Sequence, residues 1–253
     1  MRNYAIAQLT GLRDTQCDAT AVHTTPTGAR AYVLLDGIGS TETVRDWTRT
    51  AARRLARAAA RRGDAEAGLR AVYDAYADDR ADIAPTFRRY LPKAAAVVAV
   101  TVPGRPLTIA WCGDSRAYLI AQGNADRLTN DHNLRRVYPP CDKHSGGNRN
   151  VITSCLGSCD TDEEVQNRYG HPAIEAVTRT LEPCRLVLAS DGAYEPHEDT
   201  SRPLADELAG DPRSVARYFT EIAIYRAIAT TRALDPNRPY ADNATVLVAD
   251  IGR

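Results

Sequence analysis

Four aspartates of the sequence each stand where a strongly apolar stretch ends or begins. They are Asp36 in Leu-Leu-Asp-Gly, Asp114 in Cys-Gly-Asp-Ser, Asp191 in Ala-Ser-Asp-Gly and Asp242 in Asp-Asn-Ala-Thr. A carboxylate at the end of a buried strand is costly unless something neutralises it, and most of the four have no lysine or arginine beside them. We therefore expect these carboxylates to converge on bound cations.

The stretch that carries Asp36 has a second interpretation. Residues 36–40 read Asp-Gly-Ile-Gly-Ser and precede an expected helix, as in a phosphate cradle at a helix N-terminus. The stretch lacks the Gly-Lys-Thr of nucleotide-binding loops, and the order of strands and helices does not fit a nucleotide-binding fold. We favour the simpler function of the glycines, a sharp turn with close approach of the backbone to a bound group.

The elements that would position these aspartates form groups of strands and pairs of helices. Apolar stretches predict strands over residues 4–10, Ala19–His23, Ala31–Leu35, Ala95–Val102, Leu107–Trp111, Ala117–Ala121, Ala173–Thr180, Cys184–Ala189 and Ala244–Ile251. Apolar residues at helical spacing predict helices over residues 45–62, from Asp64 to Tyr76 and over residues 212–229. This grouping favours antiparallel sheets covered by helices, an α+β fold, and a single domain over residues 1–253.

Size and charge narrow the class of protein. At 253 residues the chain is long enough to bury one sizeable core. Its formal net charge of zero gives no electrostatic footprint for nucleic acid and no polybasic signal for a membrane surface, so the arginines over residues 45–62 indicate a solvated helix face. The N-terminus lacks the apolar core of a signal peptide. We expect a cytoplasmic protein that binds neither nucleic acid nor membrane.

The cysteines do not form the pattern of a disulfide framework. Six of them are scattered along the chain, at Cys17, Cys112, Cys141, Cys155, Cys159 and Cys184. Cys141-x-x-His144 followed by Cys155-x-x-x-Cys159 has a spacing that resembles a zinc site. Because Cys155 stands in a stretch with apolar neighbours, we favour reduced thiols over a zinc site.

Seven short motifs are spread over essentially the whole chain. They are Gly11-Leu12-Arg13 with Asp18, Asp36-Gly37-Ile38-Gly39, Gly113-Asp114-Ser115-Arg116-Ala117, Leu128-Thr129-Asn130-Asp131-His132, Asn150-Val151-Ile152-Thr153 with Leu156-Gly157, Ser190-Asp191-Gly192 and Asp242-Asn243-Ala244-Thr245. Each is weak alone, but together and in this order they resemble the metal-dependent protein phosphatases of the type 2C family, in a form typical of bacterial members. The resemblance implies a central antiparallel β-sandwich flanked by helix pairs, in four αββα layers, with metal ions at one end.

The resemblance also implies a role for each residue of the site. Asp36 would bridge two metal ions, and the carbonyl oxygen of Gly37 would be a further ligand. Asp191 and Asp242 would ligate the first ion. Asp114, together with Asp191, would form the third-metal position of bacterial members.

Two further residues complete the implied site. Asp18 would ligate an ion through a water, and Arg13 would grip the substrate phosphate with its planar fork. Carboxylate, carbonyl and water are hard ligands that suit Mn²⁺ or Mg²⁺ rather than zinc. Ions held in this way activate water for in-line displacement, with Arg13, Asp36 and Asp191 as the catalytic set.

The implied reaction is the hydrolysis of phosphoserine and phosphothreonine in proteins. The partners would be phosphoproteins, including a Ser/Thr kinase or its targets, and we expect a monomer. The alternative from another class is a pseudophosphatase, in which the same fold serves as a regulatory protein-binding module.

Three departures from the family pattern bear on activity. Cys17 stands where the family usually has an acidic ligand of the second ion, so we expect a weaker second site or a preference for Mn²⁺. Ile38 replaces a histidine that is the proposed general acid in many eukaryotic members, as bacterial members often do. The flap between His132 and Asn150 is short. Cys17 also suggests a redox-regulated enzyme, but retention of all four aspartates favours an active phosphatase.

Arg13 and the pair Asp131–His132 also have purely structural interpretations. Arg13 could form a salt bridge with Asp14 or Asp18, although we favour phosphate binding. For Asp131 and His132 we favour a structural hydrogen-bonded pair over a catalytic role.

Overall fold

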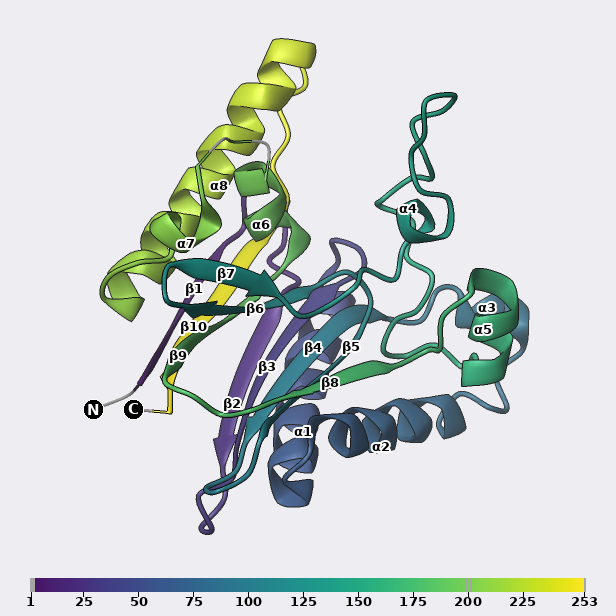
Figure 1. Ribbon diagram of the computed structural model, residues 1–253. Coiled ribbons are helices and arrows are strands. Elements are labelled where there is room, and N and C mark those ends of the chain that lie inside the picture. Colours follow the sequence, from purple (N-terminus) through teal and green to yellow (C-terminus); the bar gives the residue numbers. More distant parts are fainter. Residues whose placement is uncertain (1–2, 199, 201, 253) are drawn as a thin grey trace.

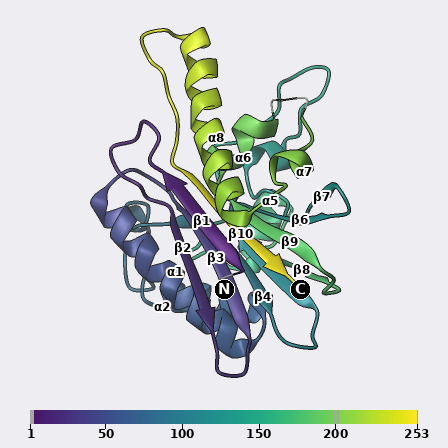
Figure 2. The same ribbon diagram turned by 90° about the vertical axis from the view of Figure 1, so that its left-hand side faces the viewer.

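The computed structural model describes residues 3–198, 200 and 202–252, and its strands form two sheets (Figures 1 and 2). One sheet has the order β1 (Tyr4–Leu9), β10 (Ala244–Ile251), β9 (Cys184–Ala189), β6 (Arg116–Ala121) and β7 (Asn124–Arg127). The other has the order β2 (Ala19–Thr24), β3 (Arg30–Gly37), β4 (Ala94–Thr101), β5 (Leu107–Cys112) and β8 (Glu175–Arg179). The strand pairings of the described residues are antiparallel.

The two sheets pack face to face, and each central strand is apolar on both of its faces. One face is buried between the sheets and the other beneath the helices. Leu34 of β3 points into the space between the sheets, where Leu188 of β9 and Leu247 of β10 are also buried. The neighbouring Val33 and Leu35 point to the opposite face and pack in the core beneath the helices. A strand buried on both faces has to be apolar throughout, as β3 is before its final Asp-Gly.

Helices cover the outer face of each sheet (Figure 1). α1 (Glu42–Arg62) and α2 (Ala65–Asp78) lie on the sheet that contains β3, while α6 (Asp191–Glu198) and α8 (Pro212–Leu234) lie on the other. The short helices are α3 (Pro85–Arg88), α4 (Leu134–Val137), α5 (Asp162–Tyr169) and α7 (Leu204–Glu207). Within the described part of the chain, none of these helices has the length and apolarity needed to cross a membrane.

The predicted α+β class and the sandwich flanked by helix pairs are confirmed, but some boundaries differ. The last helix extends to Leu234, and the strand predicted from Ala173 begins at Glu175. The sequence does not predict β7, because Asn124 resembles a turn residue. The turn is instead made by Gln122 and Gly123, which have φ angles of 51° and 79°, so that Asn124 begins the strand.

The flap expected between His132 and Asn150 projects from the sandwich, on the opposite side of its upper end from α8 (Figure 1). We call residues 132–150 the flap. The flap contains α4 and a tip in which the N–H groups of Cys141 and His144 donate to each other's carbonyl oxygens, at 3.0 and 3.2 Å. These bonds give the tip a defined turn.

The predicted hydrogen-bonded pair of Asp131 and His132 is wrong. Asp131 accepts two hydrogen bonds from Arg116, at 2.9 and 2.8 Å. His132 lies 2.9 Å from Glu175 through Nε2 and accepts a bond from the N–H of Gly113 at Nδ1. The two side chains point to different partners and tie the base of the flap to β6 and to β8.

His171 makes a testable contribution to stability. Its ring is stacked on that of His132 with centroids 4.2 Å apart. Burial is the main cause that lowers the pKa of His171 to about 4, and the charge of His132 is the next. The unfolded chain takes up this proton near pH 6.5, so the free energy of unfolding should fall as pH falls from 6.5 to about 4. Urea unfolding of His171→Gln should show a shallower fall over this window. Equal slopes for the two proteins would contradict the argument.

Candidate active site

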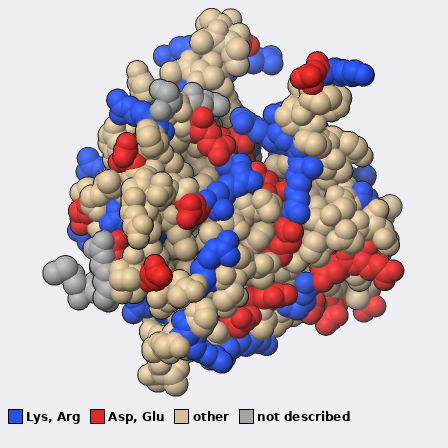
Figure 3. Space-filling view, in the orientation of Figure 1, with Lys and Arg blue, Asp and Glu red and all other residues tan. Residues whose placement is uncertain are grey.

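A cleft at one end of the sandwich collects most of the predicted site residues. It has a volume of about 390 Å³ and lies between the end of the flap and α8. Figure 3 shows acidic side chains in a hollow between these two projections. Six of the seven predicted site residues line the cleft: Arg13, Asp36, Gly37, Asp114, Asp191 and Asp242. Segments far apart in the sequence therefore deliver their carboxylates to one place.

Asp36 and Asp191 lie within hydrogen-bonding reach of each other in this cleft. Burial raises the pKa of Asp36 well above its ordinary value, and the charges of Asp18 and Asp191 raise it further. Burial also raises the pKa of Asp191, although the N–H of Gly192 donates to its carboxylate at 2.6 Å. Two carboxylates this close repel each other unless a proton or a cation lies between them.

Two glycines bring the backbone close to these acids. A Cβ on Gly37 would lie 2.5 Å from the carbonyl oxygen of Cys17. Gly113 has a φ of 104°, and a Cβ there would lie 2.3 Å from that of Ala95. A side chain at either position would displace the strand end that carries an aspartate.

Asp114 is buried, and a tyrosine of α6 holds its backbone. The hydroxyl of Tyr194 donates to the carbonyl oxygen of Asp114 at 3.1 Å. Burial raises the pKa of Asp114 well above its ordinary value, and the charge of Asp191 is the next cause. The two carboxylates are therefore close enough to influence each other, as a shared cation position would require.

Asp242 holds Arg13 at the edge of the cleft. Its Oδ2 accepts from Nη2 of Arg13 at 2.7 Å and from the hydroxyl of Tyr240 at 2.7 Å. Arg13 thus pairs with neither Asp14 nor Asp18, the two partners that its structural interpretation named. Each carboxylate oxygen has about two lone-pair sites, so these bonds leave Asp242 able to ligate an ion.

Asp18 lies beneath the cleft and does not line it. It is 2% exposed, and its Oδ2 accepts from the hydroxyl of Ser190 at 3.1 Å. Its Oδ1 has no hydrogen-bond partner among the described residues. Burial raises the pKa of Asp18 to about 7, with smaller contributions from Asp191 and Asp242. A buried carboxylate oxygen without a partner in the chain is suited to a water or a cation.

The donor atoms of the cleft fit a hard divalent ion. They are carboxylate and carbonyl oxygens in a buried, negatively charged setting, which is the chemistry of Mg²⁺ and Mn²⁺ sites. Among the described residues, no three His, Cys, Asp or Glu side chains are grouped so that they could hold a metal ion by themselves. This finding still fits Mg²⁺, which usually keeps several waters and takes only one or two carboxylates.

Comparison with known proteins shows the fold and a family likeness over part of the chain. The family model for protein phosphatase 2C matches residues 30–137, a range that contains Asp36 and Asp114. Over this range, the chain is similar to the protein phosphatase 2C family. A curated relative, the "Probable protein phosphatase 1N" of Mus musculus, is 26% identical over 73% of this chain and 50% of that protein. The chain thus spans about half the length of this curated relative.

Solved structures of the same fold cover nearly the whole chain. The PPM Ser-Thr phosphatase MsPP from Mycobacterium smegmatis, in complex with cacodylate, is 22% identical, with a TM-score of 0.69 and coverage of 98% of both chains. A bacterial serine phosphatase is 20% identical, with a TM-score of 0.67 and coverage of 99% of this chain and 98% of that one. The protein phosphatase 2C fold therefore extends well beyond the range of the family model.

Three further side chains of the cleft are not predicted by the sequence. Arg149 at the end of the flap pairs with Glu195 of α6 at 3.0 Å, and both line the cleft. Tyr240 lies under the guanidinium of Arg13, with 5.1 Å between its ring centroid and Cζ. Arg149 is far in sequence from all four aspartates, so no local signal marks it. The available signals are that Tyr240 stands two residues before Asp242 and that α6 follows Asp191, which places Glu195 one helical turn further on.

The six cysteines of the chain are free thiols. Cys17 is fully buried, burial raises the pKa of its thiol, and its Sγ lies 3.6 Å from the carbonyl oxygen of Thr41. Of the zinc-like set, Cys141 is exposed at the tip of the flap whereas Cys155 is buried. The zinc interpretation is therefore not supported.

Proposed function

We propose that this protein is a protein serine/threonine phosphatase that hydrolyses phosphoserine and phosphothreonine in proteins with the help of Mn²⁺ or Mg²⁺. One observation supports this most strongly. On a protein phosphatase 2C fold, the carboxylates of Asp36, Asp114, Asp191 and Asp242 line a single cleft together with Arg13. We treat residues 1–253 as one catalytic domain of this type.

The residues of the cleft would bind two ions, with a position for a third. Asp36, Asp191, Asp242 and the carbonyl oxygen of Gly37 are the proposed ligands of the first two, and Asp114 is the proposed ligand of the third. When bound, such ions provide nucleophilic water at neutral pH and neutralise charge on the phosphate.

Arg13 is the proposed phosphate-binding residue. Its guanidinium is held on one side by Asp242 and on its face by Tyr240. Its Nε is buried and has no hydrogen-bond partner among the described residues. A guanidinium fixed in this way keeps N–H groups available for two phosphate oxygens, and fixing it in advance reduces the entropy lost when the substrate binds.

Turnover and metal binding test the proposal together. The protein should release phosphate from a phosphoserine peptide with Mn²⁺ and not with EDTA, and calorimetry should detect Mn²⁺ binding. Asp191→Asn should abolish turnover and weaken Mn²⁺ binding. Absence of both turnover and Mn²⁺ binding in the natural sequence would contradict the proposal and favour the pseudophosphatase alternative, which nothing in the fold or the comparisons supports.

Cys17 gives a sharper prediction for the second ion. A neutral thiol is a poor ligand for hard cations, so Cys17→Glu should lower the Mn²⁺ concentration that gives half-maximal activity, by roughly tenfold or more. Cys17→Gln is the matched control, because it has almost the same shape without the charge. The measurement is a Mn²⁺ titration of activity and of heat. Equal Mn²⁺ dependence of the Glu and Gln variants would show that residue 17 does not face an ion.

The remaining expectations stay predictions. They are a cytoplasmic location, a monomeric state, and a Ser/Thr kinase or its targets among the partners. One structural relative is described as a key regulatory component of a type VI secretion system, PppA of Pseudomonas aeruginosa. That description is compatible with a signalling role for this chain.

A further inference from the structure

A second pocket adjoins the cleft on the side of the flap. It has a volume of about 470 Å³ and shares Arg149 and Glu195 with the cleft. We call it the arginine pocket, because five arginines line it: Arg116, Arg127, Arg135, Arg136 and Arg149. Two of the seven motifs contribute Arg116, Asn130 and Asp131 to its lining, but no role predicted for the phosphatase reaction uses this pocket.

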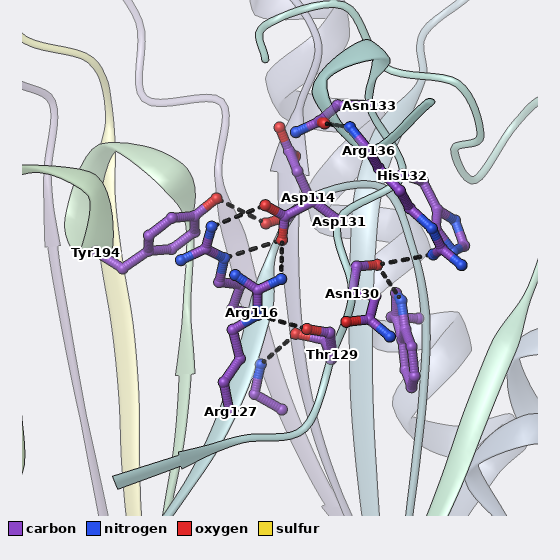
Figure 4. A network of polar contacts seen from close by, with 12 residues as sticks. Asp114, Arg116, Arg127, Thr129, Asn130, Asp131, His132, Asn133, Arg136 and Tyr194 are labelled. Carbon is purple, nitrogen blue, oxygen red and sulfur yellow. Dashed lines mark hydrogen bonds and ion pairs between the residues drawn. The ribbon is translucent and has the colours of Figure 1, made fainter. Parts of the chain in front are cut away.

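Two of these arginines are already neutralised by carboxylates, and Figure 4 shows one of them, Arg116, beside Asp131. Arg116 donates to Asp131 from Nε and Nη2 and also contacts Glu198. Arg136 donates to Glu175 at 2.5 and 2.9 Å. Two nitrogens of each guanidinium already donate to a carboxylate, so neither side chain is well placed to bind another anion.

Two others are positioned but have no strong anionic partner. Arg127, at the end of β7, donates from Nε to the carbonyl oxygen of Thr129 at 2.7 Å, and its only carboxylate neighbour among the described residues is Asp131, at 3.9 Å. Arg135 of α4 donates from Nε to the carbonyl oxygen of Gly147 at 3.2 Å, and no ion pair of Arg135 is found among the described residues. Both guanidiniums are thus held at Nε, while their terminal nitrogens remain available to a ligand.

The charge of the arginine pocket is opposite to that of the neighbouring cleft. Its lining contains five arginines and three acids, whereas the cleft is lined by five acids and two arginines. Figure 3 shows the same separation, with red side chains in the hollow and a band of blue ones along the flap side. A ligand that spans both would place its phosphate group among the ions of the cleft and a second anion among these arginines.

We infer that the arginine pocket binds an anionic side chain of the substrate, a carboxylate or a second phosphate, beside the phosphoresidue held in the cleft. The inference rests on the proposed phosphatase function and names its preferred substrates: phosphopeptides with an acidic or phosphorylated neighbour. Arg127 and Arg135 are the specificity-determining residues. A guanidinium fork that is held in place recognises either anion through charge-assisted hydrogen bonds.

The test uses a set of fluorescent phosphoserine peptides that differ only in their flanks. One has neutral flanks, one series moves a glutamate through the flanking positions, and another moves a second phosphoserine. Binding is measured by anisotropy and turnover by phosphate release, both with Mn²⁺. At its best position, either anion should tighten binding about tenfold and lower KM with little change in kcat. Added salt should weaken this preference.

Variants connect the preference to the pocket. In the double variant Arg127→Gln/Arg135→Gln, peptides with an anionic flank should bind no more tightly than the neutral peptide, so that the roughly tenfold preference is lost. Arg53→Gln, on the exposed face of α1, is the matched control and should keep it. A glutamate preference without a phosphoserine preference, or the reverse, would identify which anion the pocket selects, and either result would support the site. Equal binding of all peptides, or a preference that survives in the double variant, would overturn it. Because binding is measured apart from turnover, a retained preference without turnover would contradict only the proposed function.

Discussion

Replacing Asp36 by asparagine is expected to lower kcat/KM for a phosphoserine peptide by about 10³-fold or more, since bound ions supply several kcal/mol of charge stabilisation. Asp36 lines the cleft within hydrogen-bonding reach of Asp191, where the proposed ions would be bridged. An amide keeps the shape of the side chain but removes the charge that holds a divalent ion. Steady-state kinetics over a range of Mn²⁺ concentrations measure the loss and show whether added Mn²⁺ restores activity.

The same substitution should stabilise the metal-free protein. Asp36 is crowded by the carboxylates of Asp18 and Asp191, so removing one charge relieves repulsion in a buried site. Asp36→Asn should therefore unfold at a higher temperature than the natural sequence in EDTA. Asp126→Asn, on the exposed strand β7, should change neither quantity. Full activity of Asp36→Asn would rule out a role in the reaction, and a lower unfolding temperature in EDTA would contradict the crowding argument.

Replacing Arg116 by methionine is expected to destabilise the protein by about 3–5 kcal/mol. The Arg116 side chain is 7% exposed, binds both carboxylate oxygens of Asp131 and lies 3.8 Å over the ring of Tyr194 (Figure 4). Without it, the nearest cation to the largely buried carboxylate of Asp131 is Arg127, at 3.9 Å. Urea unfolding measures the loss of stability, and at roughly 2–4 °C per kcal/mol the melting temperature should fall by about 10 °C.

Two further variants distinguish the effect of breaking the Arg116–Asp131 ion pair from the general effect of losing an arginine. Arg70→Met breaks a more exposed pair with Asp162 and should cost less than about 1 kcal/mol. Adding Asp131→Leu to Arg116→Met should restore part of the stability, because the carboxylate that then remains without Arg116, that of Glu198, is 45% exposed and can be solvated. A loss in Arg116→Met no larger than that in Arg70→Met would contradict the argument.

The sandwich and the convergence of aspartates could be expected from the sequence for a physical reason. Strands such as β3 are apolar on both faces, because one face packs on the other sheet and one on helices, and the chain can expose an acid only where such a strand ends. Glycine beside Asp36 and Asp114 is required because a Cβ there would lie only 2.5 Å from the carbonyl oxygen of Cys17 and 2.3 Å from the Cβ of Ala95. The positions of these aspartates and glycines can therefore be predicted from the local sequence.

The rest depends on contacts between distant segments, for which local composition gives no signal. Arg13 has acids one and five residues away, yet its partner is Asp242 at the far end of the chain. Asp131 and His132 are adjacent, but their partners lie in β6 and β8. The cleft also depends on the position of the flap and on the length of α8, which no motif determines.

The most direct test of the central claim is a crystal grown with Mn²⁺ and measured for anomalous scattering at the manganese edge. The account predicts peaks in the cleft within about 2.0–2.6 Å of carboxylate oxygens of Asp36, Asp191 and Asp242. A cleft without an anomalous peak at saturating Mn²⁺, or peaks only at unrelated surface carboxylates, would contradict it.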